Sequence, residues 1–186
     1  SAPTSPFGLI ERARSDIARF QTALDSFGYY ANRVSITIAG LALSDPALPA
    51  ALDNMAAAAP VHVRIEKGPL YHLGTVTLDG EIPQSGRRVL NLHSGDAAVA
   101  ANVLDAGARM LAALQEDGYA LADVSQPIAI ADDKNYLIHV TYKVDPGRRA
   151  SIGEIRFKGL QKIDESFVRS ALTIRTGDRY QPSRIE

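Results

Sequence analysis

Hydrophobic residues in the first part of the chain recur at intervals of three and four positions, the spacing of one helical face. Ser5 can cap such a helix, and Pro6 can occupy its first turn. Gly28 suits the left-handed conformation that follows a helix end. The pattern predicts an amphipathic helix whose buried stripe comprises Ile10, Ala13, Ile17, Phe20, Leu24 and Phe27.

Two later stretches alternate apolar and polar residues, which is the pattern of half-buried strands. The first covers residues 33–38 and the second covers residues 61–66. Residues 45–60 between them are rich in alanine and proline, so we expect a long loop there, with one short helical turn as the alternative. This part of the chain is therefore predicted to fold as helix, strand, long hairpin and strand.

The residues that follow predict a complete module of one strand, two helices and a strand hairpin. Strands are expected at 75–78, 124–131 and 137–144, a turn at 132–135 and a short helix at 87–92. A longer helix is expected to begin with Asp96 as its N-cap and to end before Gly118. Its apolar face comprises Val99, Val103, Ala106, Met110 and Leu114. Both helices must then cover one face of a three-stranded sheet, which is an α+β fold.

The stretch Gly68–Gly80 reappears in register as Gly147–Gly159. The matched positions are Gly68/Gly147, Leu73/Ile152, Gly74/Gly153, Val76/Ile155, Leu78/Phe157 and Gly80/Gly159. Two further similarities pair Gly28-Tyr29 with Gly118-Tyr119 and Ser94-Gly95-Asp96 with Thr176-Gly177-Asp178. The offsets are about 80 to 90 residues, the size of a small domain. The chain is thus predicted to be a tandem array.

Three modules follow from this repeat. Residues 1–68 form a first module that lacks its opening strand, and residues 69–147 form a complete second module. Residues 148–186 begin a third, incomplete module, with a strand at 154–157 and a helix at 163–172. We expect the chain to be a fragment of a longer protein.

Composition narrows the classes of function. The 186 residues include 20 basic and 21 acidic side chains, so the net charge of -1 offers no basic face for nucleic acid. The absence of cysteine excludes disulfides and thiolate chemistry. No apolar run reaches the ~18 residues of a membrane helix, and no signal peptide is recognisable. No nucleophile motif or phosphate-binding glycine loop is present. We expect no catalytic, cofactor-binding or metal site, and no enzyme.

Several polar residues have two possible roles. The histidines, which we expect to be solvated or structural because they lack the spacing of metal ligands, are His62, His72, His93 and His139. The adjacent carboxylates, which we expect to be solvated, are Glu116-Asp117 and Asp132-Asp133. Tyr29, Tyr30 and Tyr119 are expected to pack against the sheets, with an exposed recognition patch as the alternative. Arg148 and Arg149 are expected to be an exposed pair, the alternative being that they hold a neighbouring module or partner.

The modules resemble POTRA (polypeptide-transport-associated) domains over nearly the whole chain. The motifs are Ile152-Gly-Glu-Ile-Arg-Phe-Lys-Gly-Leu160, Gly177-Asp178, Gly28-Tyr29-Tyr30, Gly118-Tyr119 and Gly68-Pro-Leu-Tyr71. Within this BamA-like superfamily, the Gly-Tyr-Tyr motif after a helix rich in Arg and Asp is most similar to the TamA (translocation and assembly module) type. The resemblance implies a region on the periplasmic face of the outer membrane of a Gram-negative bacterium, ahead of an outer-membrane β-barrel. It also implies unfolded outer-membrane or autotransporter proteins as substrates, and an inner-membrane-anchored TamB-like subunit as a possible partner.

The edges of three-stranded sheets are candidate peptide-binding sites, because unpaired N–H and C=O groups can accept an added strand. The resemblance implies that the strand after the second helix is this edge. The candidate residues are Arg33, Val34, Ser35, Ile36, Thr37 and Ile38 in the first module, and Val124, Ser125, Gln126 and Ile128 in the second. Pro127 removes a donor from the second edge, so the first is the stronger candidate.

The turns between modules are candidate seams. Their residues are Gly68, Pro69 and Tyr71 at the first seam, and Pro146, Gly147 and Arg148 at the second. The prediction is a scaffold that binds or positions substrate proteins or a partner subunit for insertion by a barrel. The alternative is a purely structural spacer, or a docking array for an envelope-spanning partner, without substrate binding.

Overall fold

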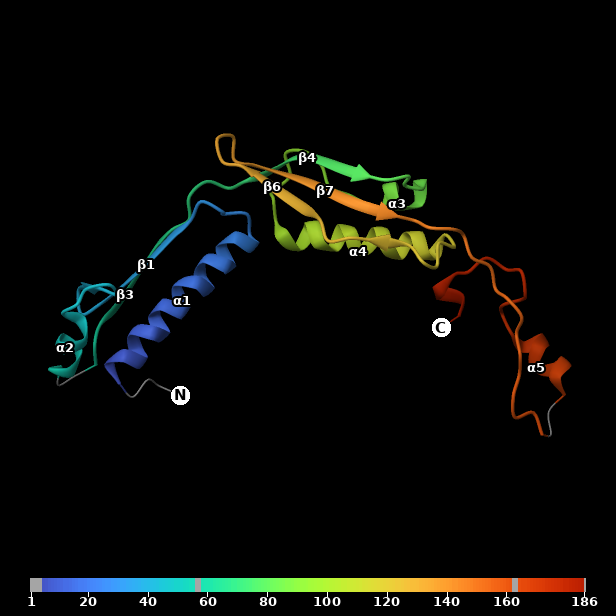
Figure 1. Ribbon diagram of the computed structural model, residues 1–186, viewed down its shortest axis with the longest axis horizontal. Helices are drawn as coiled ribbons and strands as arrows, with labels where there is room; N and C mark the ends of the chain where they lie inside the picture. Colours follow the sequence, from blue (N-terminus) through green and yellow to red (C-terminus); the bar gives the residue numbers. More distant parts are fainter. Residues whose placement is uncertain (1–4, 56–57, 162–163, 186) are drawn as a thin grey trace. The chain divides into compact units, whose positions relative to one another are not determined.

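A computed structural model describes residues 5–55, 58–161 and 164–185 (Figure 1). The described chain divides into two compact units. The first comprises residues 1–73, 95–101 and 131–138, and the second comprises residues 74–94, 102–130 and 139–186. The fold is α+β as predicted, with helices, one three-stranded sheet and one four-stranded sheet.

The first unit is built around helix α1 (Pro6–Ser26). Ser5 caps it as expected, since the Gly8 N–H donates to Ser5 Oγ over 3.1 Å. The buried stripe is shorter than predicted: Ile10 and Ala13 are buried, whereas Phe20 and Phe27 are 39% and 65% exposed. The reason is that the small core contacts only the N-terminal half of the helix. That core comprises Ile10, Ala13, Ile36, Ile38 and Leu48.

The sheet of the first unit has the order β2-β1-β3. Strands β1 (Arg33–Ile38) and β3 (Val61–Glu66) pair along their whole length, as predicted. The expectation that β3 is half-buried is wrong: all six of its residues are exposed, because the small core packs on β1 and not on β3. The two-residue strand β2 (Leu41–Ala42) pairs only with Thr37 and Ile38. Residues 48–53 form the short helix α2 (Leu48–Asp53), which is the alternative to the expected long loop, because the fully buried Leu48 anchors a helical turn on the core.

The second sheet lies within residues 69–147, which were predicted to form the complete module. Strand β7 (Leu137–Asp145) pairs with β4 (His72–Asp79) on one side and with β5 (Asp123–Val124) and β6 (Ile128–Asp132) on the other. Helix α4 (Ala100–Glu116) runs along one face of this sheet, with the short helix α3 (Gln84–Arg88) near it (Figure 1). Tyr142 projects from β7 onto α4, where its hydroxyl donates to the Val103 carbonyl over 2.6 Å.

Two helix boundaries differ from the prediction. Helix α3 begins at Gln84, before the expected 87–92 span, because the Pro83 carbonyl accepts the Gly86 and Arg87 N–H groups of its first turn. Asp96 is not the N-cap of α4, which begins at Ala100. The Asp96 carbonyl instead accepts the Leu73 N–H over 2.7 Å, so the residues before α4 serve backbone pairing.

Two predicted strands also differ. The 124–131 strand is divided into β5 and β6, because Pro127 cannot donate to the ladder. The segment 154–157 is not a strand; the described residues of the third module contain an isolated bridge between Ser151 and Arg179. Helix α5 (Glu165–Ala171) is capped by Asp164 and is shorter than predicted, and Ile163 lies outside the described residues. A 3₁₀ turn, η1 (Pro182–Arg184), follows.

Replacing Tyr142 with Phe tests the packing of the complete module. Burial raises the pKa of Tyr142 to about 12, so its hydroxyl stays a donor at neutral pH. Losing this one neutral hydrogen bond should lower the free energy of unfolding in urea by about 0.5–1.5 kcal/mol. The exposed Tyr136→Phe change is the control and should stay within about 0.5 kcal/mol of wild type. Equal stability of the two variants would contradict the assigned role.

Candidate functional site

Four backbone hydrogen bonds define the first seam. They join the residue after α1, the lead-in to β4 and the loop before α4: Tyr71 N–H to Gly28 O (2.9 Å), Ala98 N–H to Tyr71 O (2.9 Å), Leu73 N–H to Asp96 O (2.7 Å) and Gly95 N–H to Leu73 O (2.8 Å). All of these residues belong to the first unit. Residues 71–73, which lead into β4, are therefore held by main-chain bonds to Gly28 on one side and to residues 95–98 on the other.

The second seam repeats the same bonds at the positions matched by the sequence repeat. They are Ala150 N–H to Gly118 O (2.8 Å), Tyr180 N–H to Ala150 O (3.1 Å), Ile152 N–H to Asp178 O (2.7 Å) and Gly177 N–H to Ile152 O (2.8 Å). These residues all belong to the second unit. The repeat thus encodes one backbone joint, used twice.

Glycine is required where the helix passes into each joint. Gly28 and Gly118 have φ angles of 92° and 93°, which side-chain-bearing residues rarely adopt. A Cβ atom on Gly118 would lie 2.8 Å from Arg179 Cγ, and one on Gly28 would lie 3.3 Å from the Ala98 carbonyl oxygen. Both glycines therefore allow the close approach on which the seam depends.

The two seams place their tyrosine at different positions of the shared joint. Tyr71 is 2% exposed at the first seam, opposite Ala98, whereas the second seam has Ala150 opposite Tyr180. The Tyr71 hydroxyl donates to Asp133 Oδ1 over 2.9 Å. Burial, followed by this bond and charge, raises the pKa of Tyr71, so it remains a neutral donor.

Aromatic rings complete the first seam. Tyr30 and Tyr136 each meet Tyr71 edge to face, with ring centroids 5.4 Å and 5.5 Å away. The Tyr30 hydroxyl donates to the Ala98 carbonyl over 2.9 Å. Lys67 lies over the Tyr29 ring at 5.2 Å. The expected packing of these tyrosines on the sheet is therefore corrected: they line the seam.

Asp117 is the charged centre of the second seam. Its carboxylate, 21% exposed, accepts from Arg149 and Arg179 over 2.9 Å each and from the Ser85 hydroxyl over 3.0 Å. Burial of Asp117 favours its neutral form, but these hydrogen bonds and the two guanidinium charges outweigh it and lower the pKa of Asp117. Arg149 also lies over the Tyr119 ring at 5.1 Å.

These contacts correct three expectations. Asp117 and Asp133 are not simply solvated carboxylates, since each accepts hydrogen bonds at a seam. Arg149 agrees with the alternative prediction that it holds a neighbouring module, because it donates to Asp117. Arg148 is exposed, as expected. Sequence reasoning missed Tyr180 as a seam residue. The repeat could have identified it, because Tyr180 lies two residues after Asp178, just as Ala98 lies two residues after Asp96.

The remaining predicted seam residues lie in the connecting turns. Gly68 and Gly147 have φ angles of 68° and 62°, and the Gly147 N–H donates to Asp145 Oδ1 over 2.9 Å. Pro69 and Pro146 are half-buried.

The first candidate edge is open over part of its length, because β2 pairs only with Thr37 and Ile38. The Ala39 N–H donates to Pro60 on the β3 side over 2.9 Å. Since backbone groups alternate along a strand, the N–H and C=O of Val34 and Ile36 point to the other side. The unpaired stretch of β1, residues 33–36, is called the open edge below.

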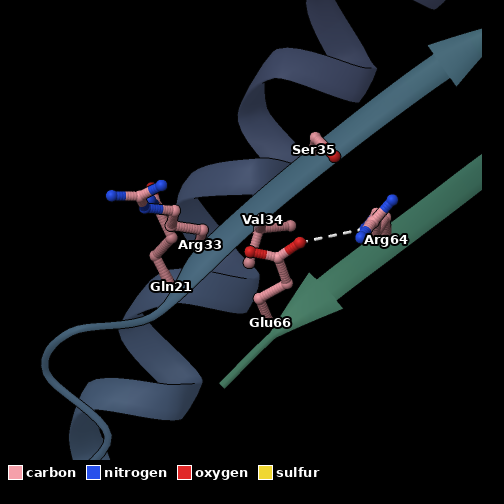
Figure 2. Close-up of a pocket in the computed structure, with 6 residues that line it drawn as sticks. All are labelled: Gln21, Arg33, Val34, Ser35, Arg64 and Glu66. Carbon is pink, nitrogen blue, oxygen red and sulfur yellow. Dashed lines mark hydrogen bonds and ion pairs between the residues drawn. The ribbon is translucent and has the colours of Figure 1, made fainter. Parts of the chain in front are cut away.

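A pocket adjoins the open edge (Figure 2). It is lined by Gln21 of α1, by Arg33, Val34 and Ser35 of β1, and by Arg64 and Glu66 of β3. Arg64 and Glu66 form an ion pair with an N–O distance of 3.0 Å. The pocket beside β1 therefore offers both positively charged and negatively charged side chains. Such a lining suits a peptide with mixed polar side chains.

The second candidate edge is interrupted. Val124 belongs to β5, and the Ser125 N–H donates to the Lys143 carbonyl over 3.0 Å. Gln126 is exposed before Pro127, and Ile128 begins β6 with 48% of its surface exposed. Pairing with β7 is thus interrupted at Pro127 and continues in β6, as the sequence suggested.

Two of the four histidines have structural partners. His139 Nδ1 accepts the Thr75 N–H over 3.0 Å, and His72 Nδ1 lies 2.9 Å from the Gly95 carbonyl. Among the described residues, no three His, Cys, Asp or Glu side chains gather in a way that could hold a metal ion. Within the same ranges, no helix is long and apolar enough to cross a membrane.

The chain has the fold of tandem POTRA modules. The arrangement matches the crystal structure of Haemophilus influenzae BamA POTRA3-5, with a TM-score of 0.53 and 20% identity, over 92% of this chain and 65% of that one. It also matches BamA from Haemophilus ducreyi lacking POTRA domains 1-3, with a TM-score of 0.51 and 18% identity, over 62% of this chain and 22% of that one.

In sequence, the chain is related to the outer membrane protein assembly factor BamA. It is 25% identical to that protein of Nitratidesulfovibrio vulgaris over 132 residues, which is 67% of this chain and 17% of the relative. The chain thus spans only a small part of the relative's length. No protein-family model matches it.

Asp117→Asn tests the ionic centre of the second seam. At neutral pH, urea denaturation should show that the variant's free energy of unfolding is lower than that of wild type by about 1–2 kcal/mol. This is the low end of the range for charged hydrogen bonds, because both arginines are half-exposed. Since the folded-state pKa is lowered, this stability is present above the ordinary carboxyl pKa and is lost as the pH falls through the folded value.

The control for this measurement is Asp105→Asn on the exposed face of α4, which should change stability little at any pH. A wild-type advantage over Asp117→Asn that persists unchanged at strongly acidic pH would contradict the ionic account.

Proposed function

We propose that this chain is the periplasmic POTRA region of an outer-membrane protein assembly factor of a Gram-negative bacterium. It binds unfolded outer-membrane proteins by β-strand addition and positions them for insertion by a barrel elsewhere in the protein. The observation that carries this proposal is the open edge of β1, in a chain related to BamA.

Strand addition at the open edge fits the chemistry of such substrates. The outward N–H and C=O groups of Val34 and Ile36 offer main-chain bonds, which do not depend on the sequence of the added strand. Specificity beyond the backbone comes from alternate side chains, and the pocket beside Arg33 and Ser35 can receive them. A site of this kind accepts many extended peptides, as a factor that handles many unfolded barrels requires.

The TamA-type assignment is a finer part of the proposal. It is supported by the Gly28-Tyr29-Tyr30 motif, and it adds autotransporter proteins as substrates and a TamB-like subunit as partner. The edge residues and seam residues named above keep their proposed roles of peptide binding and module connection.

A spacer without substrate binding is a second candidate function. It is favoured by the seams, whose eight backbone hydrogen bonds and Asp117 cluster suit an array of fixed geometry. Such a spacer needs no open edge, so a binding measurement at β1 separates the two functions.

Val34→Pro in the full chain tests strand addition. Proline removes the outward N–H of Val34 but none of the donors that face β3, so the module should stay folded. The probe is a synthetic peptide of about ten residues with the alternating pattern of a transmembrane β-strand. Wild type should bind it with NMR shifts at residues 33–36, and Val34→Pro should weaken binding at least about tenfold, the loss of one or two hydrogen bonds.

Val34→Ala is the matched control, because it trims the same side chain and keeps the N–H; its affinity should stay within about threefold of wild type. Equal binding by Val34→Pro and Val34→Ala would sink the edge assignment. No binding by wild type would favour the spacer.

A further inference from the structure

The turn between β6 and β7 reaches back to the first seam. The Tyr71 hydroxyl donates to Asp133 Oδ1 over 2.9 Å, although the two residues are 62 positions apart in the chain. The Tyr136 ring meets the Tyr71 ring edge to face, and the His72 N–H donates to the Tyr136 carbonyl over 2.9 Å. Residues 131–138 accordingly belong to the same compact unit as residues 1–73 and 95–101. The turn is therefore part of the first seam and not only the end of a hairpin.

Hydrogen bonds within the turn hold it in shape. Asp132 Oδ1 accepts the N–H groups of Lys134 and Asn135 over 3.1 Å and 3.2 Å. Asp132 Oδ2 accepts from the Asn135 side-chain amide over 2.8 Å. An aspartate that binds its own backbone in this way stabilises a turn locally. The turn therefore does not need the seam in order to form.

Tyr136 has a backbone conformation that bulky residues rarely adopt. Its φ angle is 55°, in the left-handed region. Such a conformation persists only where surrounding contacts compensate for its cost. The contacts available for this are the Tyr71 ring and the bond from the His72 N–H. The conformation of Tyr136 and the docking of residues 71 and 72 thus support each other.

The side chain of Tyr71 links this turn to the main-chain bonds of the seam. Tyr71 is 2% exposed, and its ring meets Tyr30 of the first module as well as Tyr136 of the turn. Its own N–H and carbonyl make the seam bonds to Gly28 and Ala98. Release of the Tyr71 ring would therefore weaken both of these main-chain bonds.

We propose that Asp133 and Tyr136, called the clasp below, keep the first seam closed, and that the seam opens when the clasp releases Tyr71. In the open state residues 71–73 leave Gly28 and residues 95–98, while the rest of both modules stays folded. A turn of the second module then sets how often the first seam opens. Because the clasp acts on the seam and not on β1, the proposal does not depend on the proposed function.

Amide hydrogen exchange of the full chain, measured by NMR, tests the clasp with a pair of variants at Tyr136. Tyr136→Asn removes the ring, and asparagine tolerates the left-handed conformation, so the turn should remain. The amides of Tyr71, His72 and Leu73 should then exchange about tenfold faster than in wild type, because an aromatic pair and its burial are lost. Tyr136→Phe is the matched control, since it keeps the ring and should exchange like wild type.

A second pair of variants tests the hydrogen bond of the clasp. Asp133→Ala leaves the buried Tyr71 hydroxyl without its acceptor, so the same three amides should again exchange about tenfold faster. Lys134→Ala changes an exposed side chain of the same turn and should leave their exchange at the wild-type rate.

The amides of Ser35 in β1 and Met110 in α4 report on the folding of the two modules. They should exchange at wild-type rates in every variant, because only the seam opens. Unchanged exchange at Tyr71, His72 and Leu73 in Tyr136→Asn and Asp133→Ala would overturn the proposal. An equal acceleration at Ser35 and Met110 would also overturn it, since the turn would then stabilise the whole fold instead of closing the seam.

Discussion

The structure depends on a main-chain joint that fixes a lead-in residue between two neighbouring segments. Tyr71 at the first seam and Ala150 at the second each donate to the carbonyl of a post-helical glycine and accept from the loop before the next helix. Because backbone groups carry these bonds, the joint tolerates different side chains. It can therefore recur within one chain whose repeats share few identical residues.

Side chains adapt the joint differently at each position. The first seam is aromatic and neutral, with Tyr71 buried between Tyr30 and Tyr136 and bonded to Asp133. The second is ionic, with Asp117 between two arginines. Salt and acid should therefore affect the second seam more than the first, since exposed charges are screened and carboxylates can be neutralised.

Sequence periodicity predicted the elements whose side chains repeat regularly. Helix α1, strands β1, β3 and β7, and the left-handed Gly28 follow from local patterns. Asp96 was wrongly predicted as a helix cap because its carbonyl pairs with Leu73, which is distant in sequence. Helix-capping rules consider only neighbouring residues and cannot predict such a bond. Helix α2 required knowing that Leu48 reaches the core.

The candidate site was predictable only in part. The repeat located both seams, but the partners of Tyr71 and Asp117 arise from tertiary contacts between residues 62 positions apart. Alternation within 154–157 predicted a strand, yet a strand forms only where a partner edge is available, and the described residues give it none.

Amide hydrogen exchange measured by NMR tests most directly the claim that fixed seams carry an open edge. The account predicts slow exchange at the matched seam amides of Tyr71, Ala98, Ala150 and Tyr180, and fast exchange at Val34 beside protected amides on the β3 side of β1. Fast exchange at either pair of seam amides, or a protected Val34 amide in the isolated chain, would contradict it.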